Sequence, residues 1–160
     1  MSLEIVYAYD RADEVLKLFA EYMDMLLEGD PSFAEYLTIQ NYDDELRDLS
    51  WKYGLPDGRL YLAYWDGELA GSIALRKIDD ENCELKRMYI KPEFRRNGIA
   101  VSLVRRLIED ARSIGYRHML LDTLPFLQVA IRMYQNLGFY EIERYNDSPM
   151  DTSIYMQYDL

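Results

Sequence analysis

One stretch of the sequence, residues 83–115, changes its hydrophobic period partway along and constrains the fold more than any other. Residues 85–90 alternate in the manner of a β-strand, whereas the apolar residues from Ile99 to Ile114 recur at helical spacing. Between them lies a short basic connection with Pro92, which cannot donate a hydrogen bond to a sheet. A strand therefore runs into an amphipathic helix through a turn that contains glycine.

The start of that helix is predicted to bind an anion. The first backbone N–H groups of a helix have no intrahelical partner, and they converge at the positive end of the helix dipole. Gly98 lets a ligand approach the backbone closely, Ala100 adds little side chain, and Arg95 and Arg96 add positive charge. The expected ligand is a phosphate or pyrophosphate group.

The run Arg95-Arg96-Asn97-Gly98-Ile99-Ala100 resembles the acyl-CoA signature of the GNAT acetyltransferases, Gln/Arg-x-x-Gly-x-Gly/Ala. The context is similar too, because residues 134–139 match the Tyr-x-x-x-Gly-Phe ending that closes a later helix in this family. The resemblance, to a group of small bacterial members, is strong from about residue 61 to the C-terminus. It implies an α/β, GNAT-like acyl-CoA N-acyltransferase fold: a mixed, mostly antiparallel sheet with helices on both faces. The acyl-CoA cleft is expected between two central parallel strands.

Length and composition agree with a single domain over residues 1–160. A chain of 160 residues is long enough to bury one core, and no linker or repeat divides it. One cysteine and one histidine argue against a disulfide framework and against a structural metal site. Without a signal-peptide pattern or an apolar run of membrane length, the chain is expected to be cytoplasmic, with no membrane partner.

The charge distribution suggests the partners. A net charge of −11 argues against nucleic acid, which requires a basic surface. Residues 1–50 contain thirteen Asp or Glu and three Lys or Arg, whereas residues 86–117 contain nine Lys or Arg and three Asp or Glu. This asymmetry predicts a polyanionic cofactor on the basic segment and a cationic small-molecule or peptide amine on the acidic half. A solvated acidic face explains the first half equally well. Exposed edge strands allow a homodimer.

The remaining elements follow from hydrophobic period and turn residues. Asp10 is expected to cap a helix that reaches Leu27, and a second, less regular helix is expected over residues 32–49. Pro125 suits the first turn of a helix that ends before Gly138. Strands are predicted at residues 3–9, 59–64, 69–75, 85–90, 118–122, 139–144 and 153–160.

Amine acylation requires three roles: removing a proton from the amine, stabilising charge on the carbonyl oxygen and protonating the departing thiolate. By resemblance, Tyr134 donates the proton to the thiolate. Glu84, eleven residues before Arg95, is the general base through a water molecule. The alternatives are a buried core tyrosine and a strand glutamate paired with a nearby cation. A backbone N–H near Met88 or Tyr89 is expected to stabilise the oxyanion.

The resemblance also assigns the cofactor and the acceptor. Acetyl-CoA is expected to bind through the pyrophosphate loop already described and through backbone groups of Met88 and Ile90. Many relatives have an asparagine seven residues before the tyrosine, where this chain has Leu127, so that contact is in question. Candidate acceptor-binding residues are Asp122, Arg76, Arg87, Tyr145 and Asn146.

The leading function is N-acetyl transfer from acetyl-CoA to a primary amine, by direct attack in a ternary complex. The alternative is a non-catalytic acyl-CoA sensor that keeps the phosphate loop and has lost turnover. Leu127 and the uncertain base motivate this second interpretation.

Overall fold

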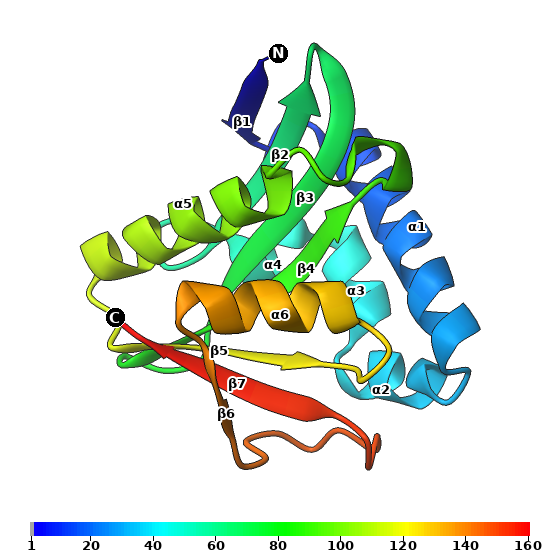
Figure 1. The fold of residues 1–160 in the computed structure, drawn as a ribbon, viewed down its shortest axis with the longest axis vertical. Helices are drawn as coiled ribbons and strands as arrows, with labels where there is room; N and C mark the ends of the chain where they lie inside the picture. Colours follow the sequence, from blue (N-terminus) through cyan, green and yellow to red (C-terminus); the bar gives the residue numbers. More distant parts are fainter. Residues whose placement is uncertain (1) are drawn as a thin grey trace.

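The computed structural model describes residues 2–160 and contains a seven-stranded sheet in the order β1-β2-β3-β4-β5-β7-β6 (Figure 1). The one parallel pair among these neighbours is β4 with β5, and the other pairs are antiparallel. The predicted mixed, mostly antiparallel sheet is therefore confirmed. The strands are β1 (Leu3–Tyr7), β2 (Arg59–Trp65), β3 (Glu68–Lys77), β4 (Asn82–Ile90), β5 (His118–Thr123), β6 (Tyr140–Ile142) and β7 (Ile154–Asp159).

The helices differ from the prediction in three places. The expected helix over residues 32–49 is three short helices, because Asn41 has a φ of 57° and Asp48 is extended. Asp10 does not cap the first helix, which begins after Arg11. The last helix begins after Leu127, whose ψ of 56° is not helical. The helices are α1 (Ala12–Gly29), α2 (Phe33–Ile39), α3 (Tyr42–Arg47), α4 (Leu49–Tyr53), η1 (Pro92–Phe94), α5 (Ile99–Ile114) and α6 (Gln128–Leu137).

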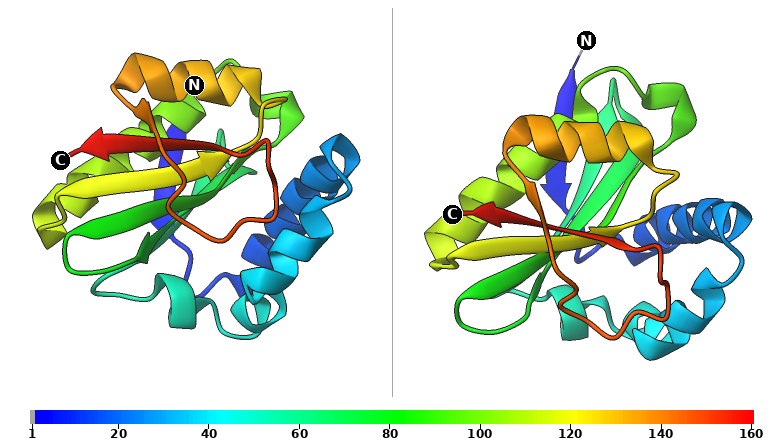
Figure 2. Two further views of the ribbon diagram at one scale, coloured as in Figure 1. Left: turned by 90° about the horizontal axis from the view of Figure 1, so that it is seen from below. Right: turned by 60° about the horizontal axis from the view of Figure 1, so that its bottom comes forward.

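The helices cover both faces of the sheet, as predicted. Figure 2 shows α5 and α6 on one side of the strands and the helices of the N-terminal third on the other. The alternation of side chains along β2 explains how one strand serves both layers. Tyr61 and Ala63 belong to the core beneath α5, whereas Leu60 and Leu62 pack with α1 on the opposite face. Within residues 2–160, no helix has the length and apolar character needed to cross a membrane.

Strand β4 carries a β-bulge near its middle. Two of its residues, Arg87 and Met88, lie opposite the single residue Ile73 of β3. Arg87 has a φ of 56°, a backbone conformation that is costly for a residue with a side chain. Its guanidinium is buried and donates to both carboxylate oxygens of Glu45, at 2.8 and 2.7 Å. The ion pair thus joins α3 to the bulge and holds the bulged conformation.

The two parallel strands separate soon after they meet. Residues 82–84 of β4 pair with residues 118–120 of β5, and the pairing stops there although both strands continue. From Leu85 onward, the edge of β4 that faces β5 has no strand partner within the described chain. The predicted cleft between two central parallel strands is this divergence.

We expect Glu45→Gln to lower the free energy of unfolding by about 3 kcal/mol, because removing one partner of a buried ion pair leaves the Arg87 charge uncompensated. Glu35→Gln, on the exposed face of the neighbouring helix, is the matched control and should change it by less than about 0.5 kcal/mol. Urea unfolding of both variants measures the difference. Equal stability of Glu45→Gln and the parent would contradict the role of this pair.

The same pair predicts how stability depends on pH. Burial opposes ionisation of Glu45, but Arg87 and Lys52 outweigh it and lower the pKa from 4.5 to about 2. Because the pKa is lower in the folded state, this contribution to stability is complete above about pH 4.5 and is lost as the pH falls towards 2. The stability difference between the parent and Glu45→Gln should therefore narrow across this range, as measured by urea unfolding at each pH. A difference that stays constant down to pH 2 would contradict the lowered pKa.

Candidate functional site

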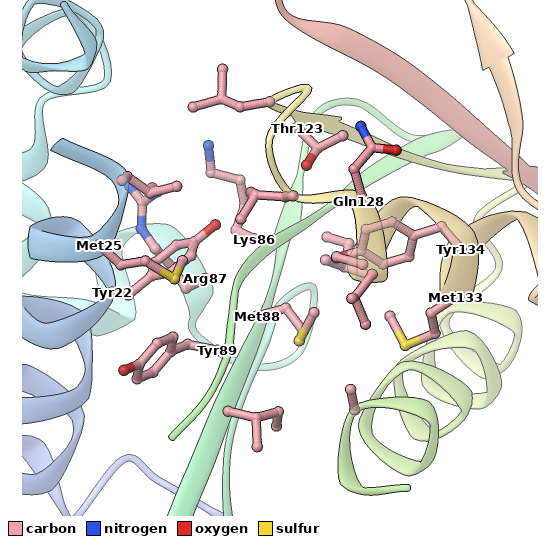
Figure 3. A pocket seen from close by; sticks show the side chains of 18 of the residues that line it. Tyr22, Met25, Lys86, Arg87, Met88, Tyr89, Thr123, Gln128, Met133 and Tyr134 are labelled. Carbon is pink, nitrogen blue, oxygen red and sulfur yellow. The ribbon is translucent and has the colours of Figure 1, made fainter. Parts of the chain in front are cut away.

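A cavity of about 640 Å³ opens where β4 and β5 diverge (Figure 3). Helices α1 and α2 form one wall, β4 forms the floor, and α6 with the start of α5 forms the other wall. Sites that hold small molecules typically occupy about 300 to 1,000 Å³, so the cavity has a suitable volume. It extends from the loop before α5 to the buried charges near the bulge.

One end of the cavity is built from backbone at the start of α5. The first hydrogen bond of this helix runs from the Ser102 N–H to the Gly98 carbonyl at 3.1 Å, so the amides before it are free of intrahelical partners. Gly98 has a φ of 75°, and an added Cβ would have no neighbour within 4 Å, which leaves open space beside the amides. Arg95 and Arg96 line the cavity here. This arrangement fits a pyrophosphate group.

Side chains of the loop hold its shape. The Arg95 Nε donates to the Ile90 carbonyl at 3.0 Å, and the guanidinium lies over the ring of Tyr89, 6.0 Å from its centroid. The Asn97 side-chain amide donates to the Phe94 carbonyl at 3.0 Å. Asn97 is not a cavity-lining side chain, so its contribution is to the turn.

The middle of the cavity lies between β4 and α6. Met88 and Ile90, whose backbone groups are expected to hold the pantetheine arm, line it from the free edge of β4, and Met133 lines it from α6 (Figure 3). Leu127 lines the wall at the position where many GNAT members have asparagine. The neighbouring Gln128 also lines it, with its side-chain amide donating to the Pro125 carbonyl.

Tyr134 projects from α6 into this middle section (Figure 3). Its ring packs against Phe139 with centroids 5.5 Å apart, and only 5 % of the residue is exposed. No residue of the described chain accepts a hydrogen bond from its hydroxyl. Burial raises the pKa of Tyr134 above its ordinary value, so the phenol carries its proton at neutral pH.

Glu84, the predicted base, lies behind the cavity wall rather than on it. It is 2 % exposed, accepts a hydrogen bond from the Arg76 Nε at 3.0 Å and another from the Tyr145 hydroxyl, and lies 3.9 Å from the Lys86 Nζ. Burial opposes its ionisation, but Lys86, Arg76 and Tyr145 outweigh it and keep the pKa below its ordinary value. A carboxylate so enclosed favours the alternative interpretation, a strand glutamate paired with cations.

The other predicted acceptor residues divide into two groups. Asp122 and Arg87 line the cavity, whereas Arg76, Tyr145 and Asn146 stand behind the residues that do.

Asp122 is held by two donors that use the same oxygen. The Tyr36 hydroxyl donates to Oδ2, and the Asn146 side-chain amide donates to Oδ2 at 3.0 Å. Within residues 2–160, no hydrogen bond uses Oδ1. The carboxylate is therefore fixed in place and keeps one oxygen available to a ligand.

The sequence analysis did not assign several polar residues that line the cavity, among them Tyr22, Gln40 and Lys86. The Lys86 Nζ donates to the Gln40 Oε1 at 3.0 Å, and the Arg87 Nη2 donates to the same oxygen at 2.7 Å. Burial raises the pKa of Tyr22 to about 12. A lysine inside a buried strand was the one available signal, since Tyr22 lies in an ordinary amphipathic helix, α1, and Gln40 follows the end of α2.

The expected acidic acceptor side is wrong. None of the thirteen acidic residues in the first fifty positions lines the cavity, because α1 and α2 turn apolar and neutral polar side chains towards it. Its charged lining is instead four basic residues and one acidic residue: Lys86, Arg87, Arg95, Arg96 and Asp122.

Comparison with known proteins gives a consistent result. Residues 17–139 match the model of the acetyltransferase (GNAT) family. An uncharacterized N-acetyltransferase of Schizosaccharomyces pombe is 33 % identical over 100 % of this chain and 95 % of that protein. By structure, the chain is similar to an acetyltransferase from Streptococcus agalactiae, with a TM-score of 0.78, 24 % identity and coverage of 99 % and 98 %. It is also similar to the PaiA N-acetyltransferase of Thermoplasma acidophilum in complex with coenzyme A, with a TM-score of 0.76, 20 % identity and full coverage of both chains.

We expect Gly98→Ala to weaken coenzyme A binding at least tenfold, because a methyl group and a shifted backbone would intrude on the free amides. Gly67→Ala is the matched control, since Gly67 also has a positive φ with open space and lies in the β2–β3 turn outside the cavity. Both substitutions should cost about 1 kcal/mol of stability. Calorimetric titration with coenzyme A separates them, and equal affinities of the two variants would contradict the assignment.

Proposed function

The chain belongs to the GNAT family of acetyl-CoA-dependent acetyltransferases, and we propose that its cavity is where an acetyl group passes directly to a primary amine in a ternary complex. The observation that carries this proposal is the continuity of one cavity from the free amides of α5, past Tyr134, to Asp122. Bound acetyl-CoA supplies an acyl group already activated as a thioester. The residues of the chain then have to bind, orient and move protons.

We propose that acetyl-CoA is bound mainly by backbone groups. The amides at residues 96–100 would hold the pyrophosphate, with Arg95 and Arg96 adding charge beside them. Backbone groups of Met88 and Ile90, on the free edge of β4, would hold the pantetheine arm. The bulge at Arg87 and Met88 leaves a residue outside the regular ladder, so a backbone N–H there is available to the carbonyl oxygen as charge develops on it.

Tyr134 is proposed as the general acid. Its hydroxyl is protonated, lines the cavity and has no partner within the described chain, so it is free to donate to the departing sulfur. Thiols have pKa values of about 8.5, below that of a phenol at about 10. Burial raises the pKa of Tyr134 further, so the transfer is uphill and requires the sulfur to lie against the hydroxyl, in a section of the cavity where desolvation also disfavours the thiolate.

Asp122, in place of Glu84, is proposed to receive the proton of the amine. Its Oδ2 is occupied by Tyr36 and Asn146, which leaves Oδ1 to accept from an ammonium group directly or through water. Because Asp122 lies near the end of β5, on the far side of the divergence from β4, it faces the region where an acceptor would approach the thioester.

We expect Tyr134→Phe to lower kcat by about 100- to 1,000-fold, because general acid catalysis contributes factors of about 10² to 10⁴. Coenzyme A affinity should be retained, since the ring is unchanged. Tyr140→Phe is the matched control: this half-exposed tyrosine lies outside the cavity and should leave kcat unaltered. Thiol release from acetyl-CoA with an amine panel gives the rates.

The alternative function, a non-catalytic acyl-CoA sensor, predicts a different result in the same thiol-release assay. A sensor would bind coenzyme A tightly and release no thiol with any amine, in the parent as in the variants. Amine-dependent release that Tyr134→Phe reduces would exclude it.

We expect Asp122→Asn to lower kcat/KM by about 100-fold while coenzyme A binding persists, because the amide keeps the bond to Tyr36 and loses basicity. Asp159→Asn is the matched control, since Asp159 also accepts from a tyrosine hydroxyl, that of Tyr140, but lies outside the cavity. Steady-state kinetics of both variants beside Glu84→Gln decide between the two carboxylates. A large loss of kcat in Glu84→Gln with none in Asp122→Asn would restore Glu84 as the base.

A further inference from the structure

The acceptor end of the cavity and the buried charges behind it together contain one more positive than negative charge. Lys52 counts as a cation because its Nζ lies 2.9 Å from the carboxylate of Glu45. Ion pairs and hydrogen bonds connect these charged side chains, apart from Asp122, into one cluster around the bulge. The four cations are Arg76, Lys86, Arg87 and Lys52, and the three anions are Glu84, Glu45 and Asp122.

Lys86 is the cation without a close carboxylate. The Arg76 Nε lies 3.0 Å from Glu84, and the Arg87 Nη2 lies 2.7 Å from Glu45, whereas the Lys86 Nζ is 3.9 Å from the Glu84 Oε1 that Arg76 already occupies. Its one hydrogen bond within the described chain goes to the neutral side chain of Gln40 at 3.0 Å. An ammonium has three donors, so two are left.

These remaining donors belong to a side chain that is buried and lines the cavity. The Lys86 side chain is 6 % exposed, and water therefore has little access to its ammonium. Leaving a buried charge incompletely paired is costly unless a ligand completes it. The group that completes an ammonium best is an anion, and a carboxylate would also restore charge balance in the cluster.

We infer that the acceptor is a small amine that carries a carboxylate, in other words an amino acid or a close analogue. This inference rests on the proposed acetyl transfer to a primary amine and names the class of that amine. Lys86 on β4 binds the carboxylate, with Gln40 orienting the ammonium of Lys86. Asp122 on β5 holds the amine. A cation on β4 and an anion on β5 thus bind the carboxylate and the amine of one zwitterion, which lies between the two strands.

The test compares free amino acids with their α-amides, which lack the α-carboxylate and have a less basic amine, so kcat/KM is expressed per unprotonated amine. Asparagine and glutamine, which keep the α-carboxylate, extend the comparison with aspartate and glutamate to side-chain carboxylates. The parent protein should acetylate the best free acid with a kcat/KM about 10- to 100-fold above that of the partner that lacks one carboxylate, measured as thiol release from acetyl-CoA. Equal or greater kcat/KM for the partners that lack a carboxylate, throughout the panel, would overturn the inference.

A variant of Lys86 tests whether this lysine causes the preference for acids over amides. Lys86→Met keeps the length of the side chain and removes the charge, so the preference for acids over amides should disappear, mainly through a higher KM for the acids. Lys77→Met, an exposed lysine at the end of β3, is the matched control and should keep the preference. If Lys86→Met keeps the acid preference of the parent, the carboxylate is not bound by Lys86 and the inference is wrong.

Failure of the proposed function has a different signature. If the protein binds coenzyme A but no amine of either class causes thiol release, the transferase proposal fails and the acceptor class falls with it. If amides or simple amines are acetylated and acids are not, the transferase proposal stands and the carboxylate inference alone is overturned.

Discussion

The buried ion pair between Arg87 and Glu45 is the interaction on which the geometry of the cavity depends. It holds an arginine in a backbone conformation with a φ of 56°, and this conformation creates the bulge in β4. Because Glu45 lies on α3, the same pair fixes the short N-terminal helices against the sheet. The bulge lies in the part of β4 that has already separated from β5, since pairing of the two strands stops after Glu84. One electrostatic contact therefore supports the bulge and the position of the helices beside the cleft.

The two halves of the cavity are built on different physical principles. The cofactor end uses backbone amides at the start of one helix, so it depends on a few consecutive residues and on the freedom of Gly98. The acceptor end uses side chains from α1, α2, β4 and β5, and several of them are held by hydrogen bonds to one another or to residues behind the cavity wall. Asp122 depends on Tyr36 and Asn146 in this way. A backbone site fits acetyl-CoA, the acetyl donor that all members of the family share, whereas a site built from side chains fits an acceptor particular to one protein.

The buried charges near the bulge, and not the more numerous surface charges, determine the electrostatic potential inside the cavity. The acidic surface of α1 and α2 is solvated and contributes nothing to the cavity lining, although it dominates the net charge of −11. A few enclosed groups determine the local potential instead, because interactions between charges are much stronger away from water. Glu84 and Glu45 neutralise Arg76 and Arg87, and the ammonium of Lys86 remains to act on the contents of the cavity.

The sequence by itself determined the features that rest on local patterns. The change of period around Pro92, the helix after Gly98 and the alternation in the strands predicted the anion-binding turn and the main strands, because each follows from residues close together in the chain. The mixed sheet and the cleft between parallel strands were implied by the resemblance of two short motifs to the GNAT family. Only the tertiary structure decided the acceptor end. It placed Glu84 behind the wall, brought Gln40 to Lys86 across 46 positions of sequence, and turned the acidic helix faces outward. Contacts between distant residues depend on packing and on the strand separation, and no local period encodes either.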